Sequence, residues 1–248
     1  MIIKEYGTNK KDTIILLHGG GLSWWNYREV AELLQEEFHI ILPILDGHTG
    51  SDRPFTSIED NAKEIIRYID ENCGGSVLMM GGLSLGGQVL LEILSQRKDI
   101  CRYAIVESAM AIPSKFTHAM IGPAFGLSYG LIKLRWFSKL QFKSLHMKEE
   151  LFEDYYKDTC GVKKKDMIYF LQANTAYELN EAINACQAKV HVYIGQKEIK
   201  GIKESAQKIQ KKIPDSKLTV LPRLYHGEFS INHAYQYVDQ VHKLVRGE

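Results

Sequence analysis

Short apolar runs alternate with amphipathic stretches along most of the chain. Near-continuous hydrophobicity is typical of central strands in a sheet that is covered on both faces. Such runs predict strands at residues 13–18, 38–43, 76–81, 102–106, 190–195 and 217–221. Apolar positions at helical spacing predict helices at residues 27–36, 58–72, 86–96, 202–213 and 233–245. This alternation favours an α/β fold with a doubly wound, mostly parallel sheet.

One long stretch breaks the alternation. Residues 111–185 contain no convincing strand and predict several helices, and these 75 of 248 residues carry 12 of the 25 Phe, Trp and Tyr side chains. A helical segment of that length between two strands is typical of an inserted subdomain rather than a loop. We therefore expect a core formed by residues 1–110 and 186–248, with residues 111–185 as an inserted helical cap.

Composition narrows the classes of partner. The 31 Lys and Arg residues nearly cancel the 30 Asp and Glu residues, which gives no electrostatic case for binding nucleic acid or an anionic membrane surface. No apolar run approaches the ~18 residues of a membrane span, and the N-terminal residues lack the apolar region of a signal peptide. The four cysteines show no metal-ligand spacing, which favours reduced thiols. We expect a cytoplasmic protein that acts on a small molecule, and the sequence leaves a homodimer open.

The strongest chemical signal is Gly82-Leu83-Ser84-Leu85-Gly86-Gly87, placed between a predicted strand and a predicted helix. A G-x-S-x-G sequence in a strand–turn–helix context is typical of a sharp turn that exposes a nucleophilic serine. Glycine at 82 and 86 removes the clash between residues on either side of the turn. The N-terminus of the following helix would then face any anion formed at Ser84.

A second glycine-rich turn, His18-Gly19-Gly20-Gly21, follows the first strong strand. Such a turn can present backbone N–H groups to an oxyanion. We predict an oxyanion hole formed by the N–H groups of Gly20 and Leu85, the residue after the nucleophile.

The order of these motifs resembles the α/β-hydrolase superfamily over essentially the whole chain. HGGG is followed by DGHTGS at residues 46–51, then by GLSLGG, a helical insertion and a late histidine. The pattern is most similar to the branch of small bacterial esterases, C–C-bond hydrolases and proline-iminopeptidase-like enzymes. That family usually has D-x-x-G-H-G-x-S as its second motif, whereas here His48 follows Asp46 by two residues and Thr49 replaces a glycine. We expect Asp46 and His48 to be structural, and the departure leaves the geometry of their loop open.

Chain order in this fold places the acid and then the histidine after the nucleophile. The resemblance implies that His226, between the last strand and the last helix, is the general base, whereas His233 lies in the helix itself. The acid is expected in the loop after the preceding strand, where Glu198 stands. Glu107 is the rival, because some relatives carry the acid at that strand end.

These residues predict acyl transfer by a serine hydrolase that needs no metal and no organic cofactor. A carboxylic ester with a small apolar or aromatic group is the first choice of substrate. Aromatic side chains near the oxyanion turn and in the insertion are weaker candidates for substrate binding, because aromatic residues pack cores first: Trp24, Trp25, Phe125, Tyr129 and Trp136. C–C-bond hydrolase, thioesterase and aminopeptidase activities use the same triad, and a non-catalytic ligand-binding protein of this fold also remains open.

Overall fold

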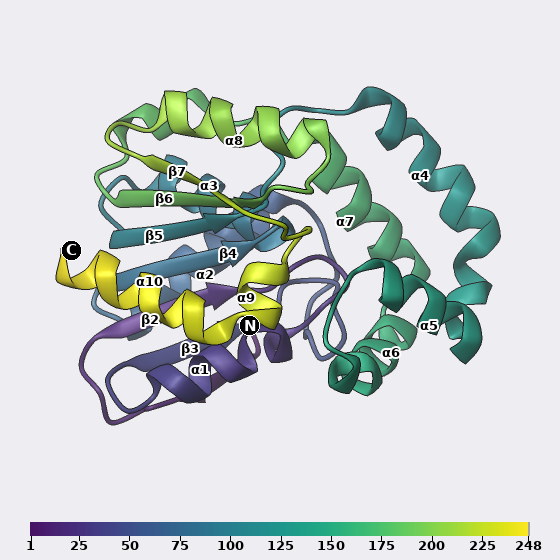
Figure 1. Ribbon diagram of the computed structural model, residues 1–248, viewed down its shortest axis with the longest axis horizontal. Coiled ribbons are helices and arrows are strands. Elements are labelled where there is room, and N and C mark those ends of the chain that lie inside the picture. The colour runs from purple at the N-terminus through teal and green to yellow at the C-terminus, as the bar shows by residue number, and fades with distance from the viewer. Residues whose placement is uncertain (248) are drawn as a thin grey trace.

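A seven-stranded sheet forms the centre of the molecule (Figure 1). The computed structural model describes residues 1–247, apart from the side chain of Leu127. The strands run in the order β1-β3-β2-β4-β5-β6-β7. Their bounds are β1 (Ile3–Tyr6), β2 (Thr13–Leu17), β3 (His39–Pro43), β4 (Val77–Leu83), β5 (Cys101–Glu107), β6 (Lys189–Gly195) and β7 (Lys217–Leu221). Only β1 is antiparallel to its neighbour, so the predicted fold class is confirmed.

The alternation of side chains along each strand creates a core on each face of the sheet. In β2, Ile15 and Leu17 join one apolar cluster, whereas Ile14 and Leu16 join the other. The first cluster is covered by α2 (Ile58–Asn72), α3 (Leu85–Gln96) and α8 (Lys200–Lys212). The second is covered by α1 (Arg28–Leu34) and α10 (Ala234–Arg246), and the short α9 (Glu228–Asn232) precedes α10. Central strands buried from both sides explain why their sequences are nearly continuous apolar runs.

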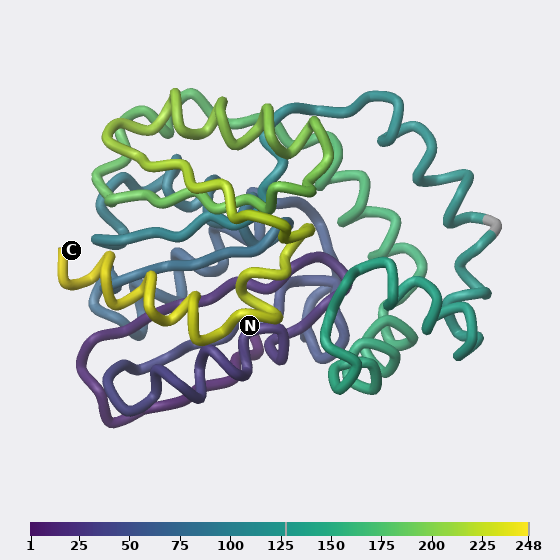
Figure 2. The backbone as a smooth tube through the Cα atoms, in the orientation of Figure 1, coloured from purple at the N-terminus to yellow at the C-terminus, as the bar shows by residue number. Residues whose placement is uncertain are grey.

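Residues 111–185, hereafter the insertion, connect β5 to β6 (Figures 1 and 2). They form α4 (Lys115–Ser128), α5 (Arg135–Ser144), α6 (Phe152–Gly161) and α7 (Lys164–Ala176), and no strand occurs among these described residues. The helices gather at one end of the sheet in Figure 1, beyond the carboxyl ends of the parallel strands. The division of the chain into a core domain and a separate cap domain stays a prediction.

Buried and partly buried polar contacts fasten the second half of the insertion to the rest of the molecule. The indole Nε1 of Trp25 donates to the Asp158 carboxylate at 2.7 Å, and the Thr49 hydroxyl donates to the Asp158 carbonyl at 2.7 Å. On α7, Asp166 accepts from the Phe55 backbone N–H at 3.0 Å. The insertion is therefore held against the loops that follow β2 and β3.

Within residues 1–247, no helix is both long enough and apolar enough to cross a membrane.

Candidate active site

Ser84 lies at the sharp turn between β4 and α3. Its backbone has φ 53° and ψ −111°, a strained conformation for a residue with a side chain. The turn is held because the Ser84 N–H donates to the Glu107 carbonyl at 2.8 Å. A Cβ on Gly82 would lie 2.4 Å from the Gly86 carbonyl oxygen, and one on Gly86 would lie 2.1 Å from the Leu17 carbonyl oxygen. Both glycines are thus required by close backbone approach, and together they let Ser84 project from the turn.

His226 and Glu198 come together from the loops that follow β7 and β6. The Nδ1 atom of His226 lies 3.1 and 3.0 Å from the two carboxylate oxygens of Glu198. Only 2% of the Glu198 side chain is exposed, compared with 45% of the His226 side chain. Burial alone would lower the pKa of His226, but the hydrogen bond and charge of Glu198 raise it above its ordinary value. Burial is the largest single effect on this pKa, but the combined effects of the carboxylates exceed it.

Glu107, the rival carboxylate, has a different environment at the end of β5. It is 1% exposed, and its Oε1 accepts from the Ser230 backbone N–H at 3.3 Å. Burial raises the pKa of Glu107 to about 7. Among the described residues it makes no hydrogen bond to His226. Of the two carboxylates predicted from the sequence, the structure brings Glu198 and not Glu107 into contact with the imidazole.

The glycine-rich turn after β2 leaves one backbone N–H group available. The Gly19 N–H donates to Asn26 Oδ1 at 3.1 Å, and the Gly21 N–H donates to His48 Nε2 at 3.0 Å. The N–H of Gly20, between them, has no hydrogen-bond partner in residues 1–247. Leu85 is the first residue of α3, so its N–H is also one that the helix itself does not use. These are the two donors that the sequence predicts for an oxyanion.

Two buried histidines hydrogen-bond to the backbone of this turn. Nδ1 of His18 donates to the Gly19 carbonyl at 2.9 Å, and its Nε2 accepts from the Leu45 N–H at 3.1 Å. His48 bonds the Asp46 carbonyl through Nδ1 while its Nε2 accepts from Gly21, and the two rings lie 4.8 Å apart. Burial lowers the pKa of His18 to about 3 and that of His48 to about 4. Both imidazoles are therefore neutral near pH 7, which allows each Nε2 to accept a hydrogen bond.

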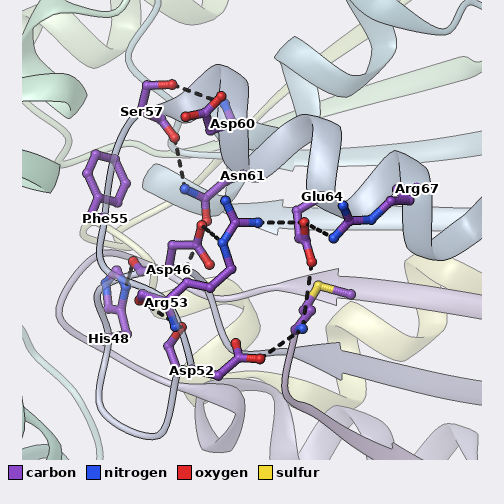
Figure 3. A network of polar contacts seen from close by, with 12 residues as sticks. Asp46, His48, Asp52, Arg53, Phe55, Ser57, Asp60, Asn61, Glu64 and Arg67 are labelled. Atoms are coloured by element: carbon purple, nitrogen blue, oxygen red, sulfur yellow. Dashed lines mark hydrogen bonds and ion pairs between the residues drawn. The ribbon is translucent and has the colours of Figure 1, made fainter.

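The loop that carries His48 is fixed by a polar network (Figure 3). The Asp46 N–H donates to Asn61 Oδ1 at 2.9 Å, and the Arg53 guanidinium lies 3.6 Å from the Asp46 carboxylate and also pairs with Glu64. Gly47 takes φ +75°, and a Cβ there would lie 2.5 Å from Phe55. This geometry accommodates the departure from the usual family motif. Asn26 and Asn61 were not predicted, and a single sequence carries no local signal for either.

Ser84 and His226 line the same small cavity, of about 70 Å³. Apolar side chains and glycines complete its wall: Gly19, Gly20, Leu22, Leu83, Leu145, Met147, Gly227 and Ile231. In the described residues no hydrogen bond joins Ser84 Oγ to His226. A second cavity, of about 230 Å³, lies between the glycine-rich turn and the insertion and shares Gly20, Leu22 and Leu145 with the first.

Residues 1–247 hold no group of three or more His, Cys, Asp and Glu side chains that could bind a metal ion.

Of the five aromatic residues proposed for substrate binding, only Phe125 lines either cavity. Trp25 is instead used to bond Asp158, and Trp24 packs beside the Arg28 guanidinium. Tyr129 donates its hydroxyl to the Val162 carbonyl, within the insertion. Trp136 is 66% exposed on α5. The insertion helices contribute other lining residues, such as Thr159, Met167 and Phe170, whose positions depend on helix packing that the sequence alone does not reveal.

Comparison with known proteins identifies the family. The model of the "Alpha/beta hydrolase family" matches residues 14–239. The chain belongs to the alpha/beta hydrolase family. This confirms the resemblance seen in the motifs and supports hydrolysis as the chemistry of the protein.

Individual alpha/beta hydrolases differ in the activity that their names give. A soluble epoxide hydrolase from Corynebacterium sp. (strain C12) is 28% identical over 88 residues, which is 35% of this chain and 31% of that relative's length. A thermophilic esterase from Thermogutta terrifontis superposes with a TM-score of 0.81 at 17% identity, covering 99% of this chain and 93% of the other. A bromoperoxidase from Bacillus anthracis gives a TM-score of 0.83 at 13% identity, covering 98% and 94%. At such identities the structural matches show the fold alone.

Proposed function

We propose that this alpha/beta hydrolase is a serine carboxylesterase that forms an acyl-enzyme on Ser84. The observation that carries the proposal is the buried Glu198 bonded to His226, whose imidazole lines the same cavity as the strained Ser84. A serine on a tight turn, a histidine and a carboxylate that orients the histidine are the three parts of an acyl-transfer site.

In the proposed first step, His226 Nε2 removes the Ser84 hydroxyl proton as Ser84 Oγ attacks the ester carbonyl carbon. The negative charge moves to the carbonyl oxygen, where the N–H groups of Gly20 and Leu85 stabilise it. The C–O bond to the alcohol then breaks, and the alcohol leaves with the proton from His226. Water, deprotonated by the same imidazole, attacks the acyl-enzyme and releases the acid and free Ser84.

The lining of the two cavities supports an ester with an apolar group. Neither cavity is lined by a Lys, Arg, Asp or Glu residue among those described, so apart from His226 no side chain in their walls offers a charge to an ionic substrate. The esterase from Thermogutta terrifontis, which shares the fold, agrees with this choice of reaction. A panel of esters, thioesters, amides and vinylogous diketones would distinguish the ester from the other bonds that such a site can cleave.

Replacement of Ser84 tests the proposal directly. We expect Ser84→Ala to lower kcat for the best ester by roughly 10⁴–10⁶ and to abolish labelling by a fluorophosphonate, as removal of a triad nucleophile does. Ser144→Ala is the matched control, because Ser144 is exposed at the end of α5, and it should behave like the wild type. Near-normal turnover by folded Ser84→Ala would exclude the mechanism, and a wild type that resists labelling would indicate a binding protein.

A further inference from the structure

Residues 145–147, hereafter the strap, lie between α5 and α6 and beside Ser84. Leu145 and Met147 line the Ser84 cavity, and His146 stands between them in the chain. Within the described residues, no other part of the insertion reaches the wall of that cavity. The strap is therefore the part of the insertion that can limit what lies next to Ser84.

Contacts with two core residues hold the strap in place. The His146 ring stacks on the ring of Tyr225, the residue before His226, with 3.8 Å between the ring centroids and 7° between the ring planes. Asn232, at the end of α9, donates from Nδ2 to the His146 carbonyl at 2.6 Å and accepts from the Lys148 N–H at 3.2 Å. The backbone of His146 has φ 55°, an unfavourable angle for a residue with a side chain. Such an angle persists where the surrounding contacts fix it, so the strap has a defined position.

Leu145 belongs to the walls of both cavities, as do Gly20 and Leu22. Residues that line two cavities stand at the boundary between them. Gly20 has no side chain, and Leu22 belongs to the buried core, whereas Leu145 is 39% exposed and comes from the strap. The Leu145 side chain is thus the part of the boundary that the insertion supplies. It separates the space next to Ser84 from the larger cavity.

The sizes of the two cavities indicate what this separation does. An apolar cavity of about 150 Å³ is needed to hold benzene, so the 70 Å³ next to Ser84 accepts a group of only a few carbon atoms. The 230 Å³ beyond Leu145 is lined mostly by apolar and aromatic side chains and has room for a longer chain. Joined, the two would reach the lower end of the ~300–1,000 Å³ that is typical of small-molecule sites.

We propose that Leu145 is a specificity-determining residue that restricts one side of the ester to a short chain, and that stacking of His146 on Tyr225 keeps Leu145 in place. The inference rests on the proposed function, because it concerns the ester that is cleaved at Ser84. Leu145 takes no part in bond cleavage. Removal of its side chain should open the larger cavity to the substrate.

Two series of esters test the proposal, and ethyl acetate begins both. Ethyl esters from acetate to hexanoate lengthen only the acyl side, and alkyl acetates from ethyl to hexyl lengthen only the alcohol side. In one of the two series, kcat/KM of the wild type should fall by roughly tenfold or more at the longest chain, because the extra methylene groups are forced against a packed wall.

Leu145→Ala should remove the fall in that series. Each methylene group that enters the opened apolar cavity can raise kcat/KM by up to roughly fourfold, so hexyl-length chains should be cleaved at least as well as the shortest. Leu140→Ala is the matched control, because Leu140 is 62% exposed on α5 and lines neither cavity, and it should keep the wild-type profile. A wild type without a length limit in either series, or a limit that survives Leu145→Ala, would overturn the proposal.

His146→Gly tests the stacking contact. It removes the ring that packs on Tyr225, and glycine adopts φ 55° more easily than histidine, so the backbone of the strap should keep its shape. Without the stack, Leu145 is displaced more easily, and the length limit should relax by roughly threefold in the same series of esters. An unchanged limit in folded His146→Gly would overturn the role given to His146.

Calorimetry with straight-chain alcohols from butan-1-ol to decan-1-ol separates this proposal from the proposed function, because binding requires no catalysis. In the wild type, affinity should stop increasing at the chain length that fills one cavity, whereas in Leu145→Ala it should continue to increase with longer chains. If no ester is cleaved but this difference is found, the role of Leu145 stands and the esterase function fails. If esters are cleaved but Leu145→Ala changes neither the ester profile nor the alcohol series, the esterase function stands and the role of Leu145 fails.

Discussion

At the scale of single residues, two carboxylates near the ends of neighbouring strands are candidates for the acid that orients His226. Glu198 contacts His226, whereas Glu107 is buried with a raised pKa and bonds the backbone of Ser230. The contact gives Glu198 the position from which a carboxylate fixes the tautomer of an imidazole and stabilises its charged form. Glu107 contributes its charge only from a distance.

We expect Glu198→Gln to lower kcat by roughly 10³–10⁴, because an amide can stabilise the wrong tautomer of His226. The pH profile should change as well. In the proposed mechanism His226 acts in its neutral form, so activity should rise with pH through its pKa, which Glu198 holds above 6.5. Without the carboxylate that pKa falls, and the acid limb of kcat/KM should move to lower pH.

Glu107→Gln is the control for this prediction, since glutamine keeps an acceptor for the Ser230 N–H. It should retain kcat to within about tenfold, with its acid limb near that of the wild type. A severe loss in Glu107→Gln together with a mild one in Glu198→Gln would reverse the assignment.

The residues with local chemistry could be predicted from the sequence. Ser84 is marked by flanking glycines, and His226 and Glu198 stand at the ends of recognisable strands. Asn26 and Asn61 could not be predicted, because each accepts a hydrogen bond from backbone that lies 7 or 15 residues away. Nothing in the sequence around an asparagine indicates which distant N–H group it meets.

At the scale of elements, the junction of β4 and α3 sets the position of Ser84, the proposed nucleophile. The turn is compressed against the end of β2, because Gly86 packs directly on the Leu17 carbonyl. The glycine-rich turn after β2 also lies close to Ser84, since a Cβ on Gly20 would lie 3.5 Å from the Leu85 side chain.

Gly86→Ala should therefore be strongly destabilising, since its Cβ would lie 2.1 Å from a backbone oxygen that cannot move without shifting β2. We expect a loss of more than about 3 kcal/mol in the free energy of unfolding, measured by urea denaturation. Gly126→Ala in α4 is the control: no atom lies within 4 Å of its Cβ, so helix propensity should stabilise it by roughly 0.5–1 kcal/mol. Similar unfolding midpoints for the two variants would contradict the packing described here.

Most elements of the sheet and its covering helices were predicted close to their observed bounds, but one strand was missed. Helix α2 and strand β7 have the bounds that their patterns indicate, and the central strands differ by only a few residues. Strand β1 was missed because Ile3–Tyr6 is a short, partly exposed edge strand with two charged residues, which hydrophobic pattern does not distinguish from a loop.

At the scale of the whole molecule, the insertion is attached unevenly. Its second half bonds the core through Asp158 and Asp166, and Asn174 on α7 exchanges hydrogen bonds with Gln88 on α3. Its position over the strand ends follows from the point where the chain leaves β5 and could be predicted. Apart from Phe125, the insertion residues that line the cavities could not be predicted, because their positions depend on how the helices of the insertion pack together.

Trp25→Phe removes the donor to Asp158 and keeps an aromatic ring in place. Burial already raises the pKa of Asp158, and the Trp25 hydrogen bond opposes that effect, so its loss leaves a partly buried carboxylate poorly satisfied. We expect faster hydrogen exchange and proteolysis in residues 152–161 and about 1–3 kcal/mol lower stability. The exposed Trp136→Phe should change neither, and an unaltered exchange rate in Trp25→Phe would show that this contact does not fasten the insertion.

Because His18 and His48 are buried in their neutral form beside the glycine-rich turn, the folded state should lose stability as the pH falls. In the unfolded chain, both imidazoles take up protons as the pH falls below 6.5, but in the folded chain His18 and His48 resist until about pH 3 and 4. Each histidine therefore removes about 1.4 kcal/mol of stability per pH unit across that interval. In the folded state Glu107 holds a proton between about pH 7 and its ordinary pKa of 4.5. Over that interval it adds about as much stability, as the pH falls, as one histidine removes.

Below about pH 4.5 Glu107 no longer offsets the histidines, so stability should fall more steeply with decreasing pH. Urea unfolding midpoints measured from pH 7 to pH 4 would show this change in slope. Acid inactivation then has two separate stages. If His226 is the general base, mild acid should protonate it and stop turnover, and neutralisation should restore activity at once. Stronger acid should protonate His18 and His48 and unfold the chain. Recovery from that stage then requires refolding.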